Sequence, residues 1–283
     1  MKLVRFGEKG QEKLGIQTED GIYDASAFGV DLSAEFLADD GLKKIAEWWK
    51  QNKSEASEIK AGTRLGAPIA NISKIVCIGL NYADHAKETN ATPPEEPILF
   101  FKAPSSISGP NDDVIIPKNS RKTDWEVELG VVIGKKANYV SKEEAMDYVA
   151  GYTLHNDYSE REFQIERGGQ WVKGKSCDTF APLGPTLVTK DEIENIDNLR
   201  LWLTVNGEKM QDGNTSNLIF KIPHLVSYVS QFMSLMPGDV ISTGTPAGVG
   251  LGMKPQVFLK DGDVVECGIE GLGSSKQHLK SYE

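Results

Sequence analysis

The spacing of apolar residues along the chain changes character near residue 70. Before that point, short alternating runs predict strands, and these are followed by an apolar stripe with helical spacing. Asp20-Gly21 is typical of a hairpin turn. The predicted strands are residues 2–6, 13–17 and 22–23. The predicted helix covers residues 33–51, and its buried face holds Phe36, Leu37, Ile45, Trp48 and Trp49. Residues 1–70 are therefore expected to form a small N-terminal α+β accessory domain.

The rest of the chain, residues 71–283, is dominated by short β-rich runs that each end at Gly, Pro or Asp. These runs are residues 75–79, 127–134, 201–205, 239–241 and 264–267. Helical patterns are few and cover residues 82–89, 142–148 and 225–232. Many short strands with few helices predict a mixed β core, either a barrel or a rolled sheet. We expect this second part to form one larger domain.

Two glutamates lie within the apolar run 127–134 and its lead-in. In a strand, side chains two residues apart share a face at a spacing of ~6.8 Å, so Glu126 and Glu128 point one way while Val127 and Leu129 point the other. Val132 shares the glutamate face, which indicates that this face is partly covered. Two neighbouring anions on a covered face repel each other and are costly to desolvate. A divalent cation removes both costs, whereas a solvated outer strand face is the simpler alternative.

A second polar cluster, residues 155–164, follows the apolar segment 149–154. A strand that ends at Asp157 would supply a third carboxylate. Three carboxylates with several water molecules make an octahedral oxygen site, and hard oxygen ligands favour Mg²⁺, Mn²⁺ or Ca²⁺ over zinc.

A histidine and a glutamate follow the predicted strand 75–79. Asn81 is a suitable cap for a short helix, and in that helix His85 and Glu88 are neighbours at i and i+3. A carboxylate bonded to one imidazole nitrogen raises the basicity of the other, which suits a general base acting on water. A surface histidine with an incidental glutamate is the alternative explanation.

Charge and motif content exclude several classes of function. The net charge is −10 and no block of Lys or Arg is present, which argues against nucleic-acid binding. The start has no signal-peptide pattern and no apolar run is long enough to span a bilayer, so a cytoplasmic protein without membrane partners is expected. Residues 243–252 are glycine-rich but match no phosphate-binding motif, and no serine-hydrolase GxSxG elbow is present. The three scattered cysteines are expected to be reduced thiols.

Taken together, these segments resemble the fumarylacetoacetate hydrolase family. The matching residues occur in the family's order between about residue 75 and residue 275. They are Asn81-Tyr82-x-x-His85-x-x-Glu88, Glu126-x-Glu128-Leu129, Asp157-x-x-x-Arg161-x-x-Gln164, Gly174-Lys175-Ser176, Pro182-x-Gly184-Pro185 and the run from Gly238 to Gly250. The length of the chain and its small N-terminal region resemble those of one subgroup of this family. That subgroup contains the diketo-deoxy sugar acid hydrolases and the fumarylacetoacetate hydrolase domain-containing 2 proteins.

The resemblance implies a rolled mixed β-sheet core, a homodimer, and a catalytic second domain with Mg²⁺ or Mn²⁺ as cofactor. It implies that the metal is held by Glu126, Glu128 and Asp157. It also implies a water-activating dyad and an active-site lysine, His85, Glu88 and Lys175, together with substrate-side residues Arg161, Gln164, Gly244 and Thr245. Specificity is expected to come from residues 102–111, 160–171 and 246–254, and Lys102 is predicted to contact substrate.

The expected function is metal-dependent hydrolysis of the C–C bond of a 2,4-dioxo acid, either an acylpyruvate or a 2,4-diketo-3-deoxy sugar acid. The 2-oxo acid end would bind the metal, and water activated by His85 would attack the 4-carbonyl, with Lys175 near the developing oxyanion. Hydrolysis is favoured because the His85–Glu88 pair is complete. Decarboxylation of oxaloacetate, or another lyase or isomerase reaction, is the first alternative. A noncatalytic ligand-binding protein is the second.

Overall fold

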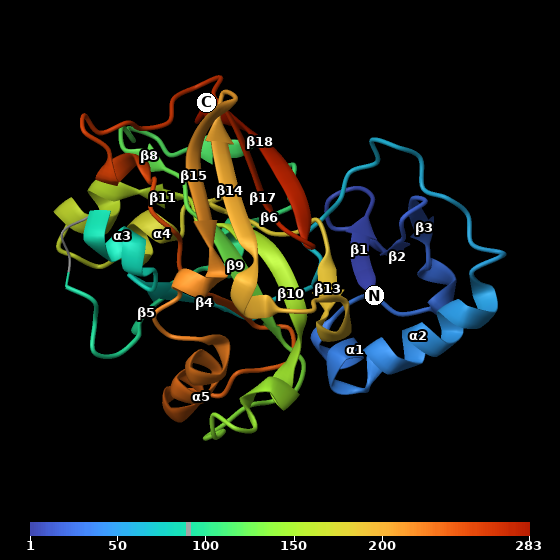
Figure 1. Cartoon of the computed structure of the whole chain (residues 1–283). Coiled ribbons are helices and arrows are strands. Elements are labelled where there is room, and N and C mark those ends of the chain that lie inside the picture. The colour runs from blue at the N-terminus through green and yellow to red at the C-terminus, as the bar shows by residue number, and fades with distance from the viewer. Residues whose placement is uncertain (89–91) are drawn as a thin grey trace.

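The protein is built around two packed β-sheets (Figure 1), as described by a computed structural model that covers residues 1–88 and 92–283. In these residues the larger sheet has nine strands, in the order β3 (Ile22–Asp24), β2 (Lys13–Gln17), β1 (Lys2–Phe6), β13 (Leu187–Thr189), β10 (Val149–Asn156), β9 (Val127–Ile133), β16 (Val240–Ser242), β4 (Ile75–Gly79) and β5 (Ile98–Lys102). The second sheet has five, in the order β15 (Glu208–Asn214), β14 (Arg200–Val205), β17 (Val264–Ile269), β18 (Gly273–Ser281) and β7 (Val114–Ile116).

Short elements complete the described part of the chain. Two small ribbons pair β8 (Thr123–Asp124) with β11 (Ser159–Glu160), and β6 (Ile107–Ser108) with β12 (Ala181–Pro182). The α-helices are α1 (Ala34–Ala38), α2 (Gly41–Asn52), α3 (Ala83–Glu88), α4 (Val172–Lys175) and α5 (Ile222–Phe232). None of the helices in residues 1–88 and 92–283 combines the length and apolar character needed to cross a bilayer.

Both large sheets are open and mixed. β16 runs parallel to β4 and β18 runs parallel to β7, whereas the other pairs within these two sheets are antiparallel. In the described residues each sheet ends on edge strands, so neither sheet closes into a barrel. Of the two architectures that the strand pattern allowed, the barrel is therefore excluded for these sheets. The predicted mixed β core with few helices is confirmed.

The core lies on both faces of β9, whose seven residues are all buried. Val127, Leu129 and Val131 pack into the cluster shared with the second sheet, and Val132 packs on the opposite side with the N-terminal segments. This alternation is the one that the sequence predicts for a strand with two buried faces. It places the glutamates of this segment on the face opposite Val127.

The N-terminal segments extend the larger sheet instead of standing apart from it. β1 pairs with β13 at Lys2–Val188 and Leu3–Leu187. The three strands predicted in this region are confirmed. Nothing in the fold tests the proposed division at residues 70/71, which stays a prediction.

The predicted helix over residues 33–51 is wrong as a single element, because the chain forms α1 and α2 with a break between them. Asp40 adopts a left-handed conformation with φ of 52°, which interrupts the regular helical hydrogen bonds. Of the other predicted helices, 225–232 is confirmed within α5, and 142–148 forms only a 3₁₀ turn, Ala145–Tyr148, before β10 begins. Helix 82–89 is confirmed as α3 up to Glu88, and residue 89 lies outside the described residues.

Candidate active site

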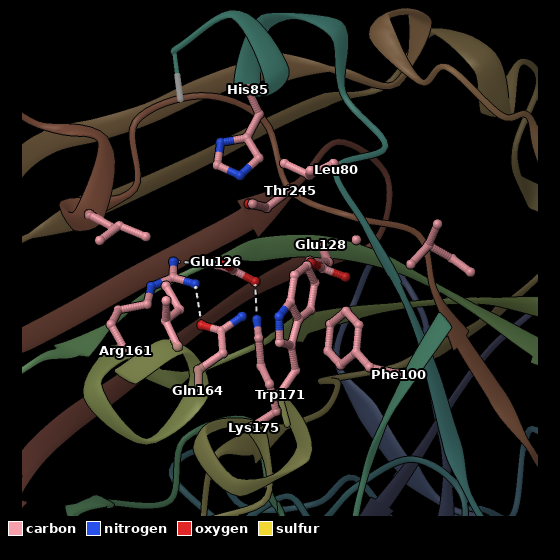
Figure 2. A pocket seen from close by; sticks show the side chains of 14 residues that line it. Leu80, His85, Phe100, Glu126, Glu128, Arg161, Gln164, Trp171, Lys175 and Thr245 are labelled. Carbon is pink, nitrogen blue, oxygen red and sulfur yellow. Dashed lines mark hydrogen bonds and ion pairs between the residues drawn. The ribbon is translucent and has the colours of Figure 1, made fainter. Parts of the chain in front are cut away.

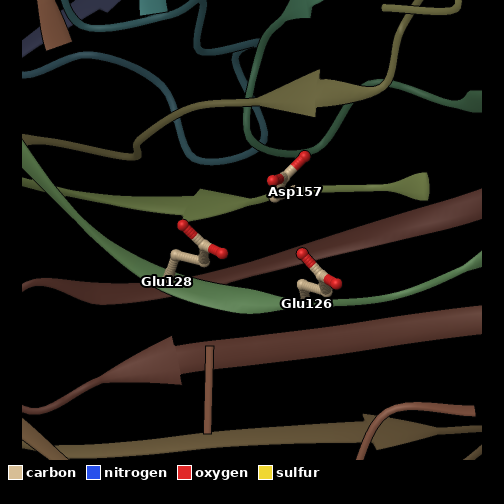
Figure 3. Close-up of side chains that lie close together, drawn as sticks. All are labelled: Glu126, Glu128 and Asp157. Atoms are coloured by element: carbon tan, nitrogen blue, oxygen red, sulfur yellow. The ribbon is translucent and has the colours of Figure 1, made fainter. Parts of the chain in front are cut away.

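Three carboxylates meet where β9 begins and β10 ends (Figure 3). The antiparallel register pairs Glu128 with His155, and the Asp157 backbone N–H donates to the Glu126 carbonyl at 2.8 Å, which sets Asp157 beside Glu126. One carboxylate oxygen from each of Glu126, Glu128 and Asp157 lies within 4.8 Å of the other two. All three side chains are buried. The strand register therefore assembles the predicted triad.

Two of these carboxylates are paired with cations. Lys175 Nζ lies 2.5 Å from Glu126 Oε2 and 3.0 Å from Asp157 Oδ2, and Lys102 Nζ donates to Asp157 Oδ1. Arg161 adds a contact of 2.7 Å to Glu126 Oε1. Burial raises the pKa of Glu126 and of Asp157, but the neighbouring positive charges outweigh it and hold both pKa values below their ordinary range. Both carboxyl groups are therefore anionic.

Glu128 has a different environment. Its Oε2 accepts hydrogen bonds from the Ser242 hydroxyl at 2.5 Å and the Gly244 N–H at 3.0 Å, which are both neutral donors. Burial, followed by the charges of Asp157 and Glu126, raises the pKa of Glu128 well above its ordinary value. No cation in the described residues forms an ion pair with this carboxylate.

The contact network around the triad carries excess negative charge. Its members in the described residues are four carboxylates and three cations, namely Asp124, Glu126, Glu128 and Asp157 against Lys102, Arg161 and Lys175. The imbalance of one negative charge resides at Glu128, next to two further carboxylates. A divalent cation held by three carboxylate oxygens would offset the repulsion among them and turn this excess into one positive charge, so the residues present fit Mg²⁺ or Mn²⁺.

His155 supports Glu128 through Ser242. His155 Nδ1 lies 2.6 Å from Ser242 Oγ, whose hydroxyl donates to Glu128. Burial lowers the pKa of His155 to about 3, so its imidazole is neutral at physiological pH. In that form Nδ1–H can donate to Ser242, and the hydroxyl proton is then directed at the carboxylate. Sequence reasoning missed both residues, since only the pairing of β9 with β10 and β16 brings them together.

Asp124 is another residue that the sequence interpretation missed. It lies two positions before Glu126 and is fully buried. Its carboxylate accepts from Arg161 Nε at 2.8 Å and from the N–H groups of Gly250 and Leu251 at 2.7 and 2.9 Å. Asp124 thereby joins Arg161 to the glycine-rich loop. The two-residue spacing from Glu126 was the one signal that could have indicated it.

A cavity of about 220 Å³ opens in front of the triad (Figure 2). Its lining residues are Ile78, Gly79, Leu80, His85, Phe100, Glu126, Glu128, Arg161, Gln164, Ile165, Trp171, Lys175, Thr245 and Leu251. Seven of these were predicted from the sequence: His85, Glu126, Glu128, Arg161, Gln164, Lys175 and Thr245. Two of the expected specificity segments, 160–171 and 246–254, contribute to the lining, but no lining residue comes from 102–111.

Of the predicted substrate residues, Lys102 and Gly244 do not line the cavity, whereas Thr245 does. Lys102 is buried on β5, where it binds Asp157 and the Tyr158 carbonyl. Gly244 directs its N–H at Glu128. The Thr245 hydroxyl donates to the Val127 carbonyl and accepts from a side-chain amide, so these donors already have partners within the protein. Their predicted contacts with substrate stay predictions.

His85 enters the cavity from α3, across from the carboxylates (Figure 2). Its Nδ1 lies 3.2 Å from Glu88 Oε2, and Glu88 Oε1 accepts the Gly248 N–H at 2.9 Å. Glu88 is thus fixed by the glycine-rich loop while it orients the imidazole. An imidazole and two carboxylates of the triad therefore line the same cavity.

Comparison with known proteins identifies the family to which the chain belongs. The family model described as the fumarylacetoacetate hydrolase C-terminal domain matches residues 74–280. A relative from Burkholderia lata is 52% identical over 282 residues, covers 99% of both chains, and is named only as a candidate hydrolase without a stated substrate. The chain therefore belongs to the fumarylacetoacetate hydrolase family, which is a family of enzymes.

Solved structures similar to this chain span more than one activity. A fumarylacetoacetate hydrolase from Exiguobacterium antarcticum is 35% identical with a TM-score of 0.87. A maleylpyruvate hydrolase from Sphingobium sp. SYK-6, in complex with manganese(II) and pyruvate, is 29% identical with a TM-score of 0.84. A 5-carboxymethyl-2-hydroxymuconate delta-isomerase from Mycobacterium smegmatis is 32% identical with a TM-score of 0.77. Each comparison covers 100% of both chains, so fold and length alone do not select the reaction.

Proposed function

We propose that this protein is a metal-dependent hydrolase that cleaves the C3–C4 bond of a 2,4-dioxo acid, releasing pyruvate and a carboxylic acid. The observation that carries the proposal is that His85, which is bonded to Glu88, lines the same cavity as Glu126 and Glu128 of the buried triad. Hydrolysis needs both a base for water and a site that binds the 2-oxo acid end. This cavity offers a candidate for each.

Glu126, Glu128 and Asp157 would hold the cation, and the manganese and pyruvate in the maleylpyruvate hydrolase structure support this choice of ligand and product. A bound Mg²⁺ or Mn²⁺ would supply a Lewis acid for the negative charge that develops on the 2-oxo acid end. Lys175 bridges Glu126 and Asp157 and so fixes the orientation of two of the three carboxylates. Arg161 Nη2 contacts Glu126 Oε1 and so positions this oxygen.

The reaction steps assigned to the chain concern water. Glu88 accepts the Nδ1–H of His85 and leaves Nε2 as the base. Nε2 takes a proton from water as its oxygen adds to C4 of the substrate. The C3–C4 bond then breaks, its electron pair goes to C3, and the proton held by His85 is available for C3. The products are pyruvate and the acid derived from the acyl group.

Two other functions remain as alternatives. The isomerase among the similar structures keeps isomerisation open, and decarboxylation of oxaloacetate would use the metal site alone. Decarboxylation needs no base for water, so it does not account for the complete dyad. Isomerisation by proton transfer could use the same dyad, so product identification has to separate it from hydrolysis. A noncatalytic ligand-binding role leaves both His85–Glu88 and the charged cavity without a purpose. A homodimer stays a prediction, which sedimentation or size-exclusion chromatography with light scattering would test.

A substrate panel with identified products tests the proposal. The Mn²⁺-loaded protein should release pyruvate from acylpyruvates and should leave oxaloacetate and delta-isomer substrates largely unchanged. His85→Ala should lose C–C hydrolysis while binding Mn²⁺ normally, and His278→Ala, at an exposed histidine on β18, is the matched control. Wild-type hydrolysis by His85→Ala would show that the base is wrongly assigned. Conversion of oxaloacetate in preference to every acylpyruvate would show that the reaction is wrongly assigned.

A further inference from the structure

Six apolar side chains from segments far apart in the sequence line the cavity, and we call them the apolar wall. They are Ile78, Leu80, Phe100, Ile165, Trp171 and Leu251. The Trp171 and Phe100 rings meet edge to face with centroids 5.3 Å apart (Figure 2). A Cβ at Gly79 would come within 2.6 Å of the Trp171 ring, so glycine at this position lets the indole lie against β4. The wall is thus a specific packing arrangement.

The cations that line the cavity are already engaged by the protein. Arg161 directs Nε at Asp124, Nη2 at Glu126 and Nη1 at the Gln164 carbonyl oxygen, at 2.8, 2.7 and 3.1 Å. Lys175 binds two carboxylates and lies 5.0 Å from the Phe100 ring centre. Among the described lining residues, each lysine and arginine already contacts at least one protein carboxylate, so a second substrate carboxylate would have to share a cation.

Charge balance leads to the same conclusion. The contact network carries one excess negative charge, which a divalent cation would convert to one excess positive charge. A single substrate carboxylate neutralises that charge. A second carboxylate would lie unpaired against the apolar wall, and burying an unpaired anion is costly. Sugar hydroxyls that lie against the apolar wall would likewise lose hydrogen bonds to water.

We infer that the substrate carries one carboxylate and a small apolar acyl group, either branched aliphatic or a single aromatic ring, in place of a second carboxylate or a sugar chain. The cavity of about 220 Å³ exceeds the ~150 Å³ that accommodates benzene, which leaves room for the dioxo acid and a small group of this kind. This inference rests on the proposed function, and it selects acylpyruvates over the sugar acids that the sequence left open.

Binding of unreactive 2-oxo acids tests the inference without turnover. The two probes are 2-oxoglutarate and 5-methyl-2-oxohexanoate, which differ only by an isopropyl group in place of the distal carboxylate. Neither has a 4-carbonyl, so neither can be hydrolysed. Calorimetry on the Mn²⁺-loaded protein should show at least about tenfold tighter binding of the branched acid, because an unpaired carboxylate is more costly than this margin.

A charge introduced at the rim should invert this preference. Ile165 is 48% exposed, so Ile165→Lys should fold normally, and it should improve 2-oxoglutarate binding while weakening that of the branched acid. Ile165→Met keeps the wall apolar and is the matched control, expected to retain the wild-type order of affinities. An unchanged order of affinities in Ile165→Lys would show that this wall does not contact the distal group.

Turnover then separates this inference from the proposed function. The kcat/KM for 4-methylpentanoylpyruvate should exceed that for succinylpyruvate by at least about tenfold. Equal or better binding and hydrolysis of the dicarboxylates would overturn the inference and leave hydrolysis standing. Tighter binding of the branched acid without hydrolysis of either acylpyruvate would overturn the proposed function alone. Failure of both 2-oxo acids to bind would overturn both.

Discussion

Glu128→Gln should have opposite effects on stability with and without metal. Glu128 is 2% exposed and lies beside two other carboxylates. Within residues 1–88 and 92–283 its hydrogen bonds come from the neutral donors Ser242 and Gly244. The substitution keeps the size of the side chain and removes its charge. In metal-free protein it removes a repulsive buried anion, whereas in metal-loaded protein it removes a ligand.

The direction of the metal-free effect follows from the raised pKa of Glu128. A carboxyl group whose folded pKa is raised contributes its full stability below the unfolded pKa of 4.5, and this stability is lost as pH rises toward the folded pKa. Wild-type protein in EDTA should therefore lose stability from this group as pH rises from 5 to 8, and Glu128→Gln should not. A typical point substitution changes stability by about 1 kcal/mol, and the gain expected from removing this anion is of that order. At pH 8 the variant should melt ~2–4 °C higher than wild type.

Manganese should reverse this order. Ligand present at a hundred times its Kd stabilises a folded protein by about 2.7 kcal/mol, and the variant should lose most of this gain. The assay is thermal unfolding of both proteins in EDTA and in Mn²⁺ at pH 5 and pH 8, with Glu55→Gln, at an exposed glutamate, as control. A variant that is less stable in EDTA at pH 8, or that is stabilised by Mn²⁺ as much as wild type, would refute the reasoning.

Three further predictions concern the base, the metal and the buried histidine. His85→Ala should lower kcat by about 10²–10⁴ and change the calorimetric Mn²⁺ affinity less than twofold, and a matching loss of affinity would count against its role as base. Glu126→Gln should weaken Mn²⁺ binding at least about tenfold, so unchanged calorimetry would remove Glu126 from the ligands. His155 is neutral because burial lowers its pKa from 6.5 to about 3, so its contribution to stability is present above pH 6.5 and lost as pH falls toward 3. Denaturant unfolding of His155→Gln in EDTA should therefore depend less steeply on pH between 6.5 and 4 than that of wild type, and identical slopes would contradict the assignment.

The local parts of the fold could be predicted from the sequence. Strand alternation placed Glu126 and Glu128 on one face and Val127 on the other, because side-chain direction in a strand depends only on spacing. The break at Asp40 was not predictable from the apolar stripe over residues 33–51, since the stripe continues through a residue with positive φ. Whether the sheets close was likewise undecided, because strand order depends on contacts between distant segments.

The site shows the same division between local and distant information. Asp157 became a neighbour of Glu126 only through the β9–β10 register, and the sequence alone suggested it chiefly through the family resemblance. Asp124 binds Arg161 across 37 positions of sequence, and Trp171 reaches the cavity by packing against Gly79. Such contacts set the shape and charge of the cavity, which is why the sequence indicated the reaction more clearly than the acyl group.

Hydrolysis in H₂¹⁸O is the most direct test of the proposed reaction. The Mn²⁺-loaded protein would be incubated with 4-methylpentanoylpyruvate, and the products would be analysed by mass spectrometry alongside His85→Ala and His278→Ala. Addition of water at C4 predicts one ¹⁸O atom in the released 4-methylpentanoate. Pyruvate should gain no more ¹⁸O than it exchanges with the solvent in the absence of enzyme. The label in 4-methylpentanoate should be lost with His85→Ala and kept with His278→Ala. Release of carbon dioxide, or a product with the mass of the substrate, would contradict hydrolysis.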